Sequence, residues 1–292
     1  MLRPFLRRMS SFPRDRISIA PMLGITNDYQ RYFVRLMTKR ATLYTEMFVD
    51  ETVLHHPACD RLVHFDKSEH PIIAQLGGSN KYKLLEAARI LEKAGYDEIN
   101  LNCGCPSPQG LSVKENRSVP PLRYDWVFRL LDDFPALDFS LNGGVVNLGV
   151  AQELLDRRSA GGRQLRGVMI GRMLSKAPWL LHYVDQFFYG ERNPPCDRYE
   201  AIMKYIDFCE EMQRGEFAPA FSPNEYLKPL FNVFVNTPGG GAYRREIFLG
   251  VNNGKSLREA VEHGLKFVSS DLLHDKAEGD IARIYEYEVP KD

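Results

Sequence analysis

The sequence predicts an α/β protein in which the strands of a parallel sheet alternate with helices, followed by a helical C-terminal part. Between residues 17 and 172, short apolar runs that end in glycine or polar residues alternate with longer runs whose apolar residues recur at helical spacing. Such alternation places helices outside a parallel sheet. After residue 178 no strand-like periodicity stands out in the sequence, which predicts helices there.

Six strands are expected, because six apolar runs are short and are followed by turn residues. The third ends in two glycines, and the fifth and sixth end in glycine-containing turns as well. The expected ranges are residues 17–22, 42–47, 71–76, 98–102, 138–141 and 167–170.

Helices are expected where apolar residues gather on one side of a helical pattern. In residues 28–38 this side carries Tyr29, Phe33 and Leu36, and in residues 81–94 it carries Leu84 and Leu91. Further helices are expected at residues 124–133, 149–156 and 198–215.

The repeating strand–helix units, with glycine at nearly every strand end, favour a TIM-type (β/α) barrel. An eight-stranded barrel uses roughly 30 residues per unit, but only six strands are found before residue 172. The run SPQGLSVKENRSVPPL at residues 107–122 is polar and proline-rich and does not accommodate a strand–helix–strand. The sequence therefore predicts an α/β barrel that lacks two βα units.

Composition limits the classes of function. The chain has 292 residues, 44% hydrophobic and 26% charged, with a formal net charge of zero, so any nucleic-acid contact needs a local basic patch. Five scattered cysteines indicate a reducing compartment, and the Cys103–Cys105 spacing lacks the second pair of a zinc site. No apolar run approaches the roughly 20 residues of a membrane span.

The N-terminal residues 1–16 contain five arginines, two serines and one acidic residue. This composition is typical of a short mitochondrial presequence, and equally of a basic tail ahead of the first strand. A cytoplasmic protein is expected, with a mitochondrial location as the alternative.

The richest candidate stretch is INLNCGCPSPQ, where the fourth strand ends. Chemistry in parallel barrels lies at the carboxyl ends of strands, and Cys105 stands there between a glycine and a proline. It could be a nucleophile, a metal ligand, a general acid or a packing thiol. Cys103 is expected to pack inside the protein.

Other strand ends carry candidate binding groups. Gln75 could hydrogen-bond a planar heterocycle or satisfy loop backbone groups. The turns Asn142-Gly143-Gly144 and Gly171-Arg172 follow the last two strands, where barrels bind phosphate through backbone N–H groups.

Each of two charged sets of residues could be either a solvated surface or a contact for nucleic acid. One is the loop of Lys114, Glu115, Asn116 and Arg117. The other lies in the helical part, and basic residues of this kind can hold phosphates. It comprises Arg244 and Arg245, with Lys228, Lys255, Arg258 and Lys266.

Taken together, these residues resemble the tRNA-dihydrouridine synthase family, specifically the D-loop-modifying branch related to the bacterial A-type enzyme. The matching pieces run in family order from about residue 17 to about residue 250. They are APMLGITN, LYTEM, AQLGG, INLNCGCPS, GLSVKENRSVPPLRYDWV, LNGGV, GVMIGR, LKPLFNVF and PGGGAYRRE.

The resemblance implies an FMN-bound barrel, reduction of the flavin by NADPH, hydride transfer to carbon 6 of a flipped-out uracil, and protonation of carbon 5 by a cysteine. It implies Cys105 as the acid and Asn102 as the group that orients the uracil. For the cofactor, Ala20, Pro21 and Met22 would pack on the flavin and Gln75 would bond its ring. The FMN phosphate would be held by Asn142, Gly143, Gly144, Gly171 and Arg172.

For the substrate, the resemblance implies that Arg117 contacts the tRNA and that a C-terminal helical domain, with Arg244 and Arg245, helps to hold it. The expected division is a tail or targeting segment at 1–16, the incomplete FMN barrel at 17–179, the tRNA-binding domain at 180–275 and a tail at 276–292. A monomer is expected.

The chain departs from the family pattern directly after Cys105. The family's glycine-rich turn, a strand with a flavin-binding lysine and a strand with a His-Ala-Arg motif have no counterpart, and no histidine lies between His70 and His182. Weak FMN binding, low activity and marginal stability are therefore expected. The alternatives are a catalytically dead variant that binds only tRNA, and a chain that does not fold stably. A dihydroorotate dehydrogenase-like barrel has no place for KENRSVPPL.

Overall fold

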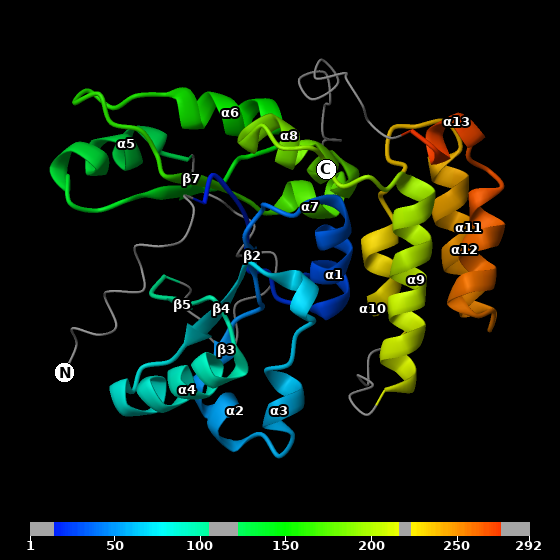
Figure 1. The fold of residues 1–292 in the computed structure, drawn as a ribbon, viewed down its shortest axis with the longest axis horizontal. Helices are drawn as coiled ribbons and strands as arrows, with labels where there is room; N and C mark the ends of the chain where they lie inside the picture. The colour runs from blue at the N-terminus through cyan, green and yellow to red at the C-terminus, as the bar shows by residue number, and fades with distance from the viewer. Residues whose placement is uncertain (1–14, 105–121, 216–222, 276–292) are drawn as a thin grey trace.

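A computed structural model describes residues 15–104, 122–215 and 223–275 (Figure 1). Its strands are β1 (Ile17–Ile19), β2 (Leu43–Tyr44), β3 (Phe48–Val49), β4 (Ile72–Gly77), β5 (Glu98–Leu101), β6 (Ser140–Asn142) and β7 (Gly167–Ile170). Every strand pair among them is parallel. The expected α/β class with a parallel sheet is thus confirmed.

The strands follow one continuous path. β1, β7 and β6 form one sheet in the order β1-β7-β6, and β4 pairs with β2, β3 and β5 in the other. A parallel bridge between Ser18 and Thr42 joins the two sheets beside β1 and β2. β2 and β3 lie along the same edge of β4, in register with its first and last residues. The path therefore runs β6-β7-β1-β2-β4-β5.

The two ends of this path, β5 and β6, are the least buried strands. β4 is buried along its whole length, whereas every residue of β5 is partly or fully exposed and only the middle residue of β6 is buried. Within the described residues, β5 pairs only with β4, and β6 only with β7. The described sheet is therefore open between β5 and β6.

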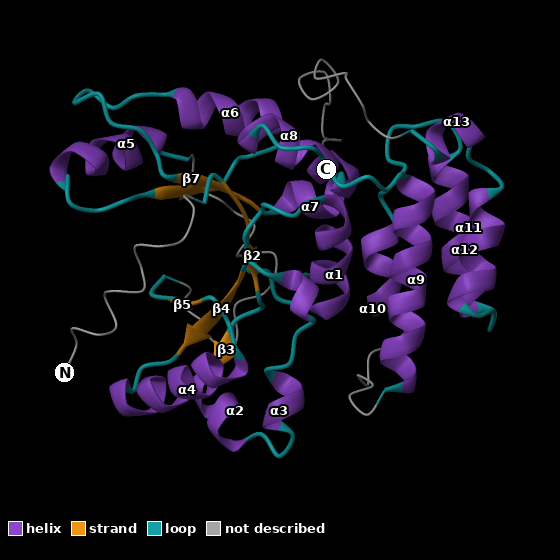
Figure 2. Cartoon of the chain, in the orientation of Figure 1, coloured by secondary structure: helices purple, strands orange, loops and turns teal. Residues whose placement is uncertain are grey.

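Helices cover the outer side of the curved sheet (Figure 2). They are α1 (Asp28–Met37), α2 (Asp50–His55), α3 (Cys59–Leu62), η1 (Lys67–Glu69), α4 (Lys81–Ala94), α5 (Tyr124–Asp133), α6 (Leu148–Asp156), α7 (Arg172–Lys176), η3 (Pro178–Tyr183) and α8 (Val184–Tyr189). Asn27 caps α1, Asn80 caps α4 and Asn147 caps α6, each by accepting a backbone N–H in the first turn.

The bounds of α4, α5 and β7 match the expected ranges. The expected strand 42–47 is wrong in extent, because β2 ends at Tyr44 and a separate β3 follows at Phe48. Helices α2 and α3 had no counterpart in the expectation, since each spans fewer than two helical turns and shows little periodicity.

The C-terminal part is helical, as expected, and comprises α9 (Arg198–Arg214), α10 (Pro223–Leu227), η4 (Lys228–Leu230), α11 (Gly240–Asn252), α12 (Leu257–Leu265) and α13 (Ser270–Leu273). It packs on α1 through aromatic rings. Tyr32 stacks on Phe208 with ring centroids 3.8 Å apart, and Phe33 meets Tyr205 edge-on at 5.1 Å. No helix in the described ranges is long and apolar enough to cross a membrane.

Helix α5 keeps an apolar side in solvent. Trp126 is 61% exposed, and Leu130 and Phe134 are also exposed, with Leu122 and Leu137 just outside the helix. These residues lie one to two turns apart on the helix that leads into β6.

Candidate functional site

The candidate residues gather at the carboxyl ends of the strands because the sheet is parallel. Gln75 lies near the end of β4, Asn102 follows β5, and Asn142 ends β6. The loops after β1 and β7 emerge on the same side, since Ile19 is in register with Ile170. Sequence-distant groups are thereby placed along one edge of the sheet.

Three amides form a hydrogen-bonded chain across β4 and β5. Asn102 Nδ2 donates to Gln75 Oε1 at 3.1 Å, and Gln75 Nε2 donates to Asn100 Oδ1 at 2.9 Å. The register pairs Gln75 with Asn100. The side-chain amide of the central Gln75 keeps one N–H and one oxygen lone pair beyond these two bonds, so it can still bind a planar polar ligand.

Asn100 is the member that the sequence reasoning missed. A signal was present, because Asn100 and Asn102 stand two residues apart and therefore point to the same face of a strand. Asn102 Oδ1 also accepts the backbone N–H of Gly104 at 3.0 Å, which fixes its amide orientation.

The loop after β1 lies against the loop after β7. Ala20 N donates to Ile170 O at 2.8 Å. A β-carbon on Gly171 would stand 3.7 Å from both the Ala20 methyl and the Met22 sulfur. Thr26 Oγ1 accepts the Met22 backbone N–H at 2.9 Å and so closes this loop, in which Pro21 is partly exposed.

A buried ion pair supports the same loop from beneath. Arg31 Nη1 donates to the Thr26 carbonyl at 2.8 Å, and Arg31 Nε donates to Glu69 Oε2 at 2.5 Å. Burial raises the pKa of Glu69, while the positive charge of Arg31 opposes that rise. The negative charges of Glu69 and Asp28 outweigh burial for Arg31 and raise its pKa, so the guanidinium stays charged.

The glycine turn after β6 lies beside the turn after β7, because Asn142 pairs with Met169. Gly143 has φ +121° and Gly144 has φ +70°, and Tyr124 Oη donates to the Gly143 carbonyl at 2.8 Å. A β-carbon on Gly144 would collide with that hydroxyl at 2.2 Å. Arg172 is exposed at the start of α7.

Two predicted site residues, Cys105 and Arg117, lie outside the described residues. Cys103 is exposed, so the expectation that it packs inside is wrong. The reason is its place directly after the edge strand β5, where the neighbouring Leu101 is also half-exposed. Within the described residues β5 pairs only with β4, so no strand on its other side covers the residues that follow it.

Half of the basic set of the helical part forms ion pairs within the described residues, and Lys228 does so with Glu225. Arg258 binds Asp207 at 2.7 Å and Glu210 at 3.0 Å, and Arg245 binds Glu246 at 3.0 Å. Arg244 donates to the Asn232 side chain at 3.2 Å, and no acidic partner is found for it within the described ranges. Lys255 and Lys266 likewise form no ion pair with a described residue.

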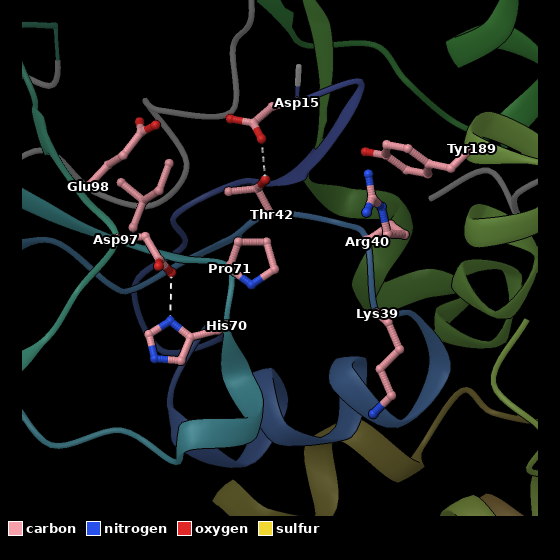
Figure 3. Close-up of a pocket in the computed structure, with 10 residues that line it drawn as sticks. Asp15, Lys39, Arg40, Thr42, His70, Pro71, Asp97, Glu98 and Tyr189 are labelled. Atoms are coloured by element: carbon pink, nitrogen blue, oxygen red, sulfur yellow. Dashed lines mark hydrogen bonds and ion pairs between the residues drawn. The ribbon is translucent and has the colours of Figure 1, made fainter. Parts of the chain in front are cut away.

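A cavity of about 290 Å³ lies on the opposite side of the sheet, at the amino ends of the strands (Figure 3). On one wall His70 Nδ1 lies 2.7 Å from an Asp97 oxygen, and Thr42 donates to Asp15 at 2.7 Å. The cavity contains none of the predicted site residues. We assign the candidate site to the carboxyl ends of the strands, where both the amide chain and the glycine turns lie.

The described residues fit the FMN that the resemblance implies. Gly143 and Gly144 adopt positive φ, and a side chain on Gly144 would close the turn. The exposed Arg172 offers a charge near that turn, and Gln75 retains hydrogen-bonding capacity for the edge of a ring. The site therefore offers both a phosphate end and a ring end.

Comparison with known proteins agrees with this geometry. The family model for dihydrouridine synthase matches residues 18–112 and 110–268. The chain is 31% identical to the tRNA-dihydrouridine(20/20a) synthase of Shewanella oneidensis, covering 88% of this chain and 95% of the relative. It is 30% identical to the enzymes of the same name from Yersinia pestis and Vibrio vulnificus, covering 88% of this chain and 93% and 98% of those relatives. The chain belongs to the dihydrouridine synthase family.

Proposed function

We propose that this chain is a flavin-dependent tRNA-dihydrouridine synthase that reduces uridine in the D-loop of tRNA. The observation that carries the proposal is the amide chain of Gln75, Asn100 and Asn102 at the carboxyl ends of β4 and β5, on the same side of the sheet as the glycine turns that follow β6 and β7. The relatives, whose names specify positions 20 and 20a, support the substrate class. Bound FMN would supply the hydride, with NADPH as its reductant.

The chain's own residues divide the remaining tasks. Asn102, whose side chain is held by Gln75 and by the backbone N–H of Gly104, orients the uracil. Cys105 donates the proton to carbon 5, and a thiol suits this task because its reference pKa of about 8.5 keeps it protonated near neutrality. Arg117 contacts the tRNA.

The cofactor contacts follow the loops described above. Ala20, Pro21 and Met22 pack against the flavin, and Gln75 bonds its ring. The phosphate is held by backbone N–H groups of the glycine turns, with Arg172 supplying charge. The residues assigned to the phosphate are Asn142, Gly143, Gly144, Gly171 and Arg172.

The helical part, residues 180–275, is proposed to hold the tRNA, with residues 17–179 as the FMN-binding barrel. Arg244 is the better phosphate contact of the predicted pair, because Arg245 is already engaged by Glu246. A monomer remains the expected state.

A second candidate function is tRNA binding without catalysis. It is favoured by the edges of β5 and β6 that no strand in the described ranges pairs with. The alignments with the three relatives run over 332 to 334 positions, more than the 292 residues of this chain. The family model also matches in two parts that meet at residues 110–112. These findings support the proposal that two βα units are missing after Cys105.

A visible absorption spectrum separates the two candidates. Purified protein is mixed with FMN and desalted, and a retained flavin spectrum supports the synthase. Conversion of uridine in an unmodified tRNA transcript, with NADPH supplied and Cys105→Ala as the inactive control, completes that case. Salt-dependent tRNA binding without retained flavin supports the binding protein.

Insertion of the relative's additional segment tests the missing units directly. The segment of the Shewanella oneidensis enzyme that has no counterpart here is inserted between Ser107 and Gly110, so that Cys105 and Arg117 are kept. If the open edges arise from missing units, the chimera melts at a higher temperature and retains more FMN than this chain. Equal melting and retention contradict the proposal.

A further inference from the structure

One exposed leucine stands at the tip of the loop after β1. Leu23 is 88% exposed. It occupies the second position of a turn that is closed by Ile25 N donating to Met22 O at 3.0 Å. Gly24, at the third position, has φ +70°, the conformation that glycine adopts most readily there. An apolar side chain at such a tip gains nothing from the fold.

The turn is nevertheless held from both sides. Glu46, from the loop between β2 and β3, accepts the Gly24 backbone N–H. Lys228, from η4 of the helical part, donates to the Gly24 carbonyl at 3.0 Å and also binds Glu225 at 2.7 Å. A turn anchored through both the N–H and the carbonyl of Gly24 presents the side chain of the neighbouring Leu23 in a fixed position.

The segment of the helical part that contains Lys228 also binds Arg244, through Asn232. Asn232, one helical turn after Lys228, donates to the Ser175 carbonyl of α7 at 2.6 Å and accepts from Arg244 at 3.2 Å. Lys228 and Asn232 therefore join the helical part to the loop after β1 and to α7. The junction carries both an exposed apolar tip and an arginine without a described acidic partner.

We propose that Leu23 is an RNA-contacting residue, whose side chain packs against a base next to the target uridine while Arg244 binds a neighbouring phosphate. Apolar side chains serve nucleic-acid enzymes in this way, since a base removed from its stack leaves apolar faces that must be covered. Glu46 and Lys228 are positioning residues that hold the turn. The inference rests on tRNA being the substrate.

The test is binding of an unmodified tRNA transcript to the full chain, measured by fluorescence anisotropy at several salt concentrations. Leu23→Ser is expected to weaken binding about tenfold, the loss of a partly buried leucine contact, without changing the salt dependence. Arg244→Ala is expected to weaken binding and to reduce the salt slope by about one unit. Leu23→Met is expected to bind like the unchanged chain.

The matched control is Leu85→Ser, because Leu85 is an exposed leucine on α4, away from the junction. Lys228→Met provides a second variant, and in its background the effect of Leu23→Ser should fall below about twofold, as coupled residues require. Retained FMN and melting temperature should stay unchanged in Leu23→Ser.

Equal tRNA affinity of Leu23→Ser and Leu85→Ser overturns the inference and leaves the proposed function standing. If the effects of Leu23→Ser and Lys228→Met on the free energy of tRNA binding are fully additive, the positioning role of Lys228 is overturned. Absence of tRNA binding by the unchanged chain overturns the tRNA substrate itself, and the inference with it.

Discussion

Gln75 accepts a hydrogen bond from Asn102 at 3.1 Å, across the ends of two neighbouring strands. The two residues are 27 positions apart, and each was predicted separately as a site residue. Their contact arises because β4 and β5 are parallel neighbours that end at the same edge.

Replacing Gln75 by leucine should weaken FMN retention about tenfold, because one ring contact and the orientation of Asn102 are lost. It should also lower the free energy of unfolding by about 1–3 kcal/mol, since Asn100 loses a buried partner. Flavin absorbance after desalting and urea unfolding measure the two effects. Gln152→Leu, whose amide bonds only to Asp156 on α6, should change neither.

Gly144→Ala should weaken flavin retention and destabilise the turn after β6. Its β-carbon would stand 2.2 Å from the Tyr124 hydroxyl, so the Tyr124–Gly143 bond would break. Gly254→Ala is the matched control, because Gly254 also has positive φ (+86°) but nothing within 4 Å of its added carbon. Thermal unfolding and flavin titration of both variants measure these effects. Equal losses of melting temperature and flavin affinity in Gly144→Ala and Gly254→Ala would contradict the collision with Tyr124 as the cause.

Arg31→Met should destabilise the fold by about 3–5 kcal/mol, because it leaves the fully buried Glu69 without its cation. Flavin retention should fall as well, since the Thr26 carbonyl loses its donor. Arg129→Met removes an exposed pair with Asp133 at 3.5 Å and should leave stability nearly unchanged. Urea unfolding distinguishes them; similar midpoints would show that the buried pair is dispensable.

Glu98→Gln should raise the melting temperature at pH 7 and leave it unchanged near pH 4. Burial raises the pKa of Glu98 above its ordinary value of 4.5, and the charges of Asp15 and Asp97 add to this while Arg166 opposes it. A raised pKa means that stability is present below pH 4.5 and is lost as the carboxyl ionises. Melting curves from pH 4 to pH 8 measure this, with the exposed Glu153→Gln as control. If the difference in melting temperature between Glu98→Gln and the unchanged chain grew toward low pH, the expected direction of the pH dependence would be contradicted.

The local elements were readable from the sequence because they depend on neighbours along the chain. The apolar spacing of residues 81–94 and of residues 124–133 fixed both helices, and short apolar runs bounded by glycine marked most strands. The motifs APM, AQLGG and NGG identified the loops that carry the candidate site. Cys105 and Arg117 remain predictions from sequence alone.

The tertiary structure decided which of these residues meet. The bonds of Gln75 to Asn100 and Asn102 depend on the β4–β5 register, which no local pattern encodes. The exposure of Cys103 and of Trp126 depends on which elements pack beside β5 and α5, and local sequence patterns do not encode this. The anchoring of Gly24 by Lys228 joins residues 204 positions apart. Contacts of this kind are set by the packing of distant elements, because hydrophobic burial is non-directional and leaves register and neighbours to the whole fold.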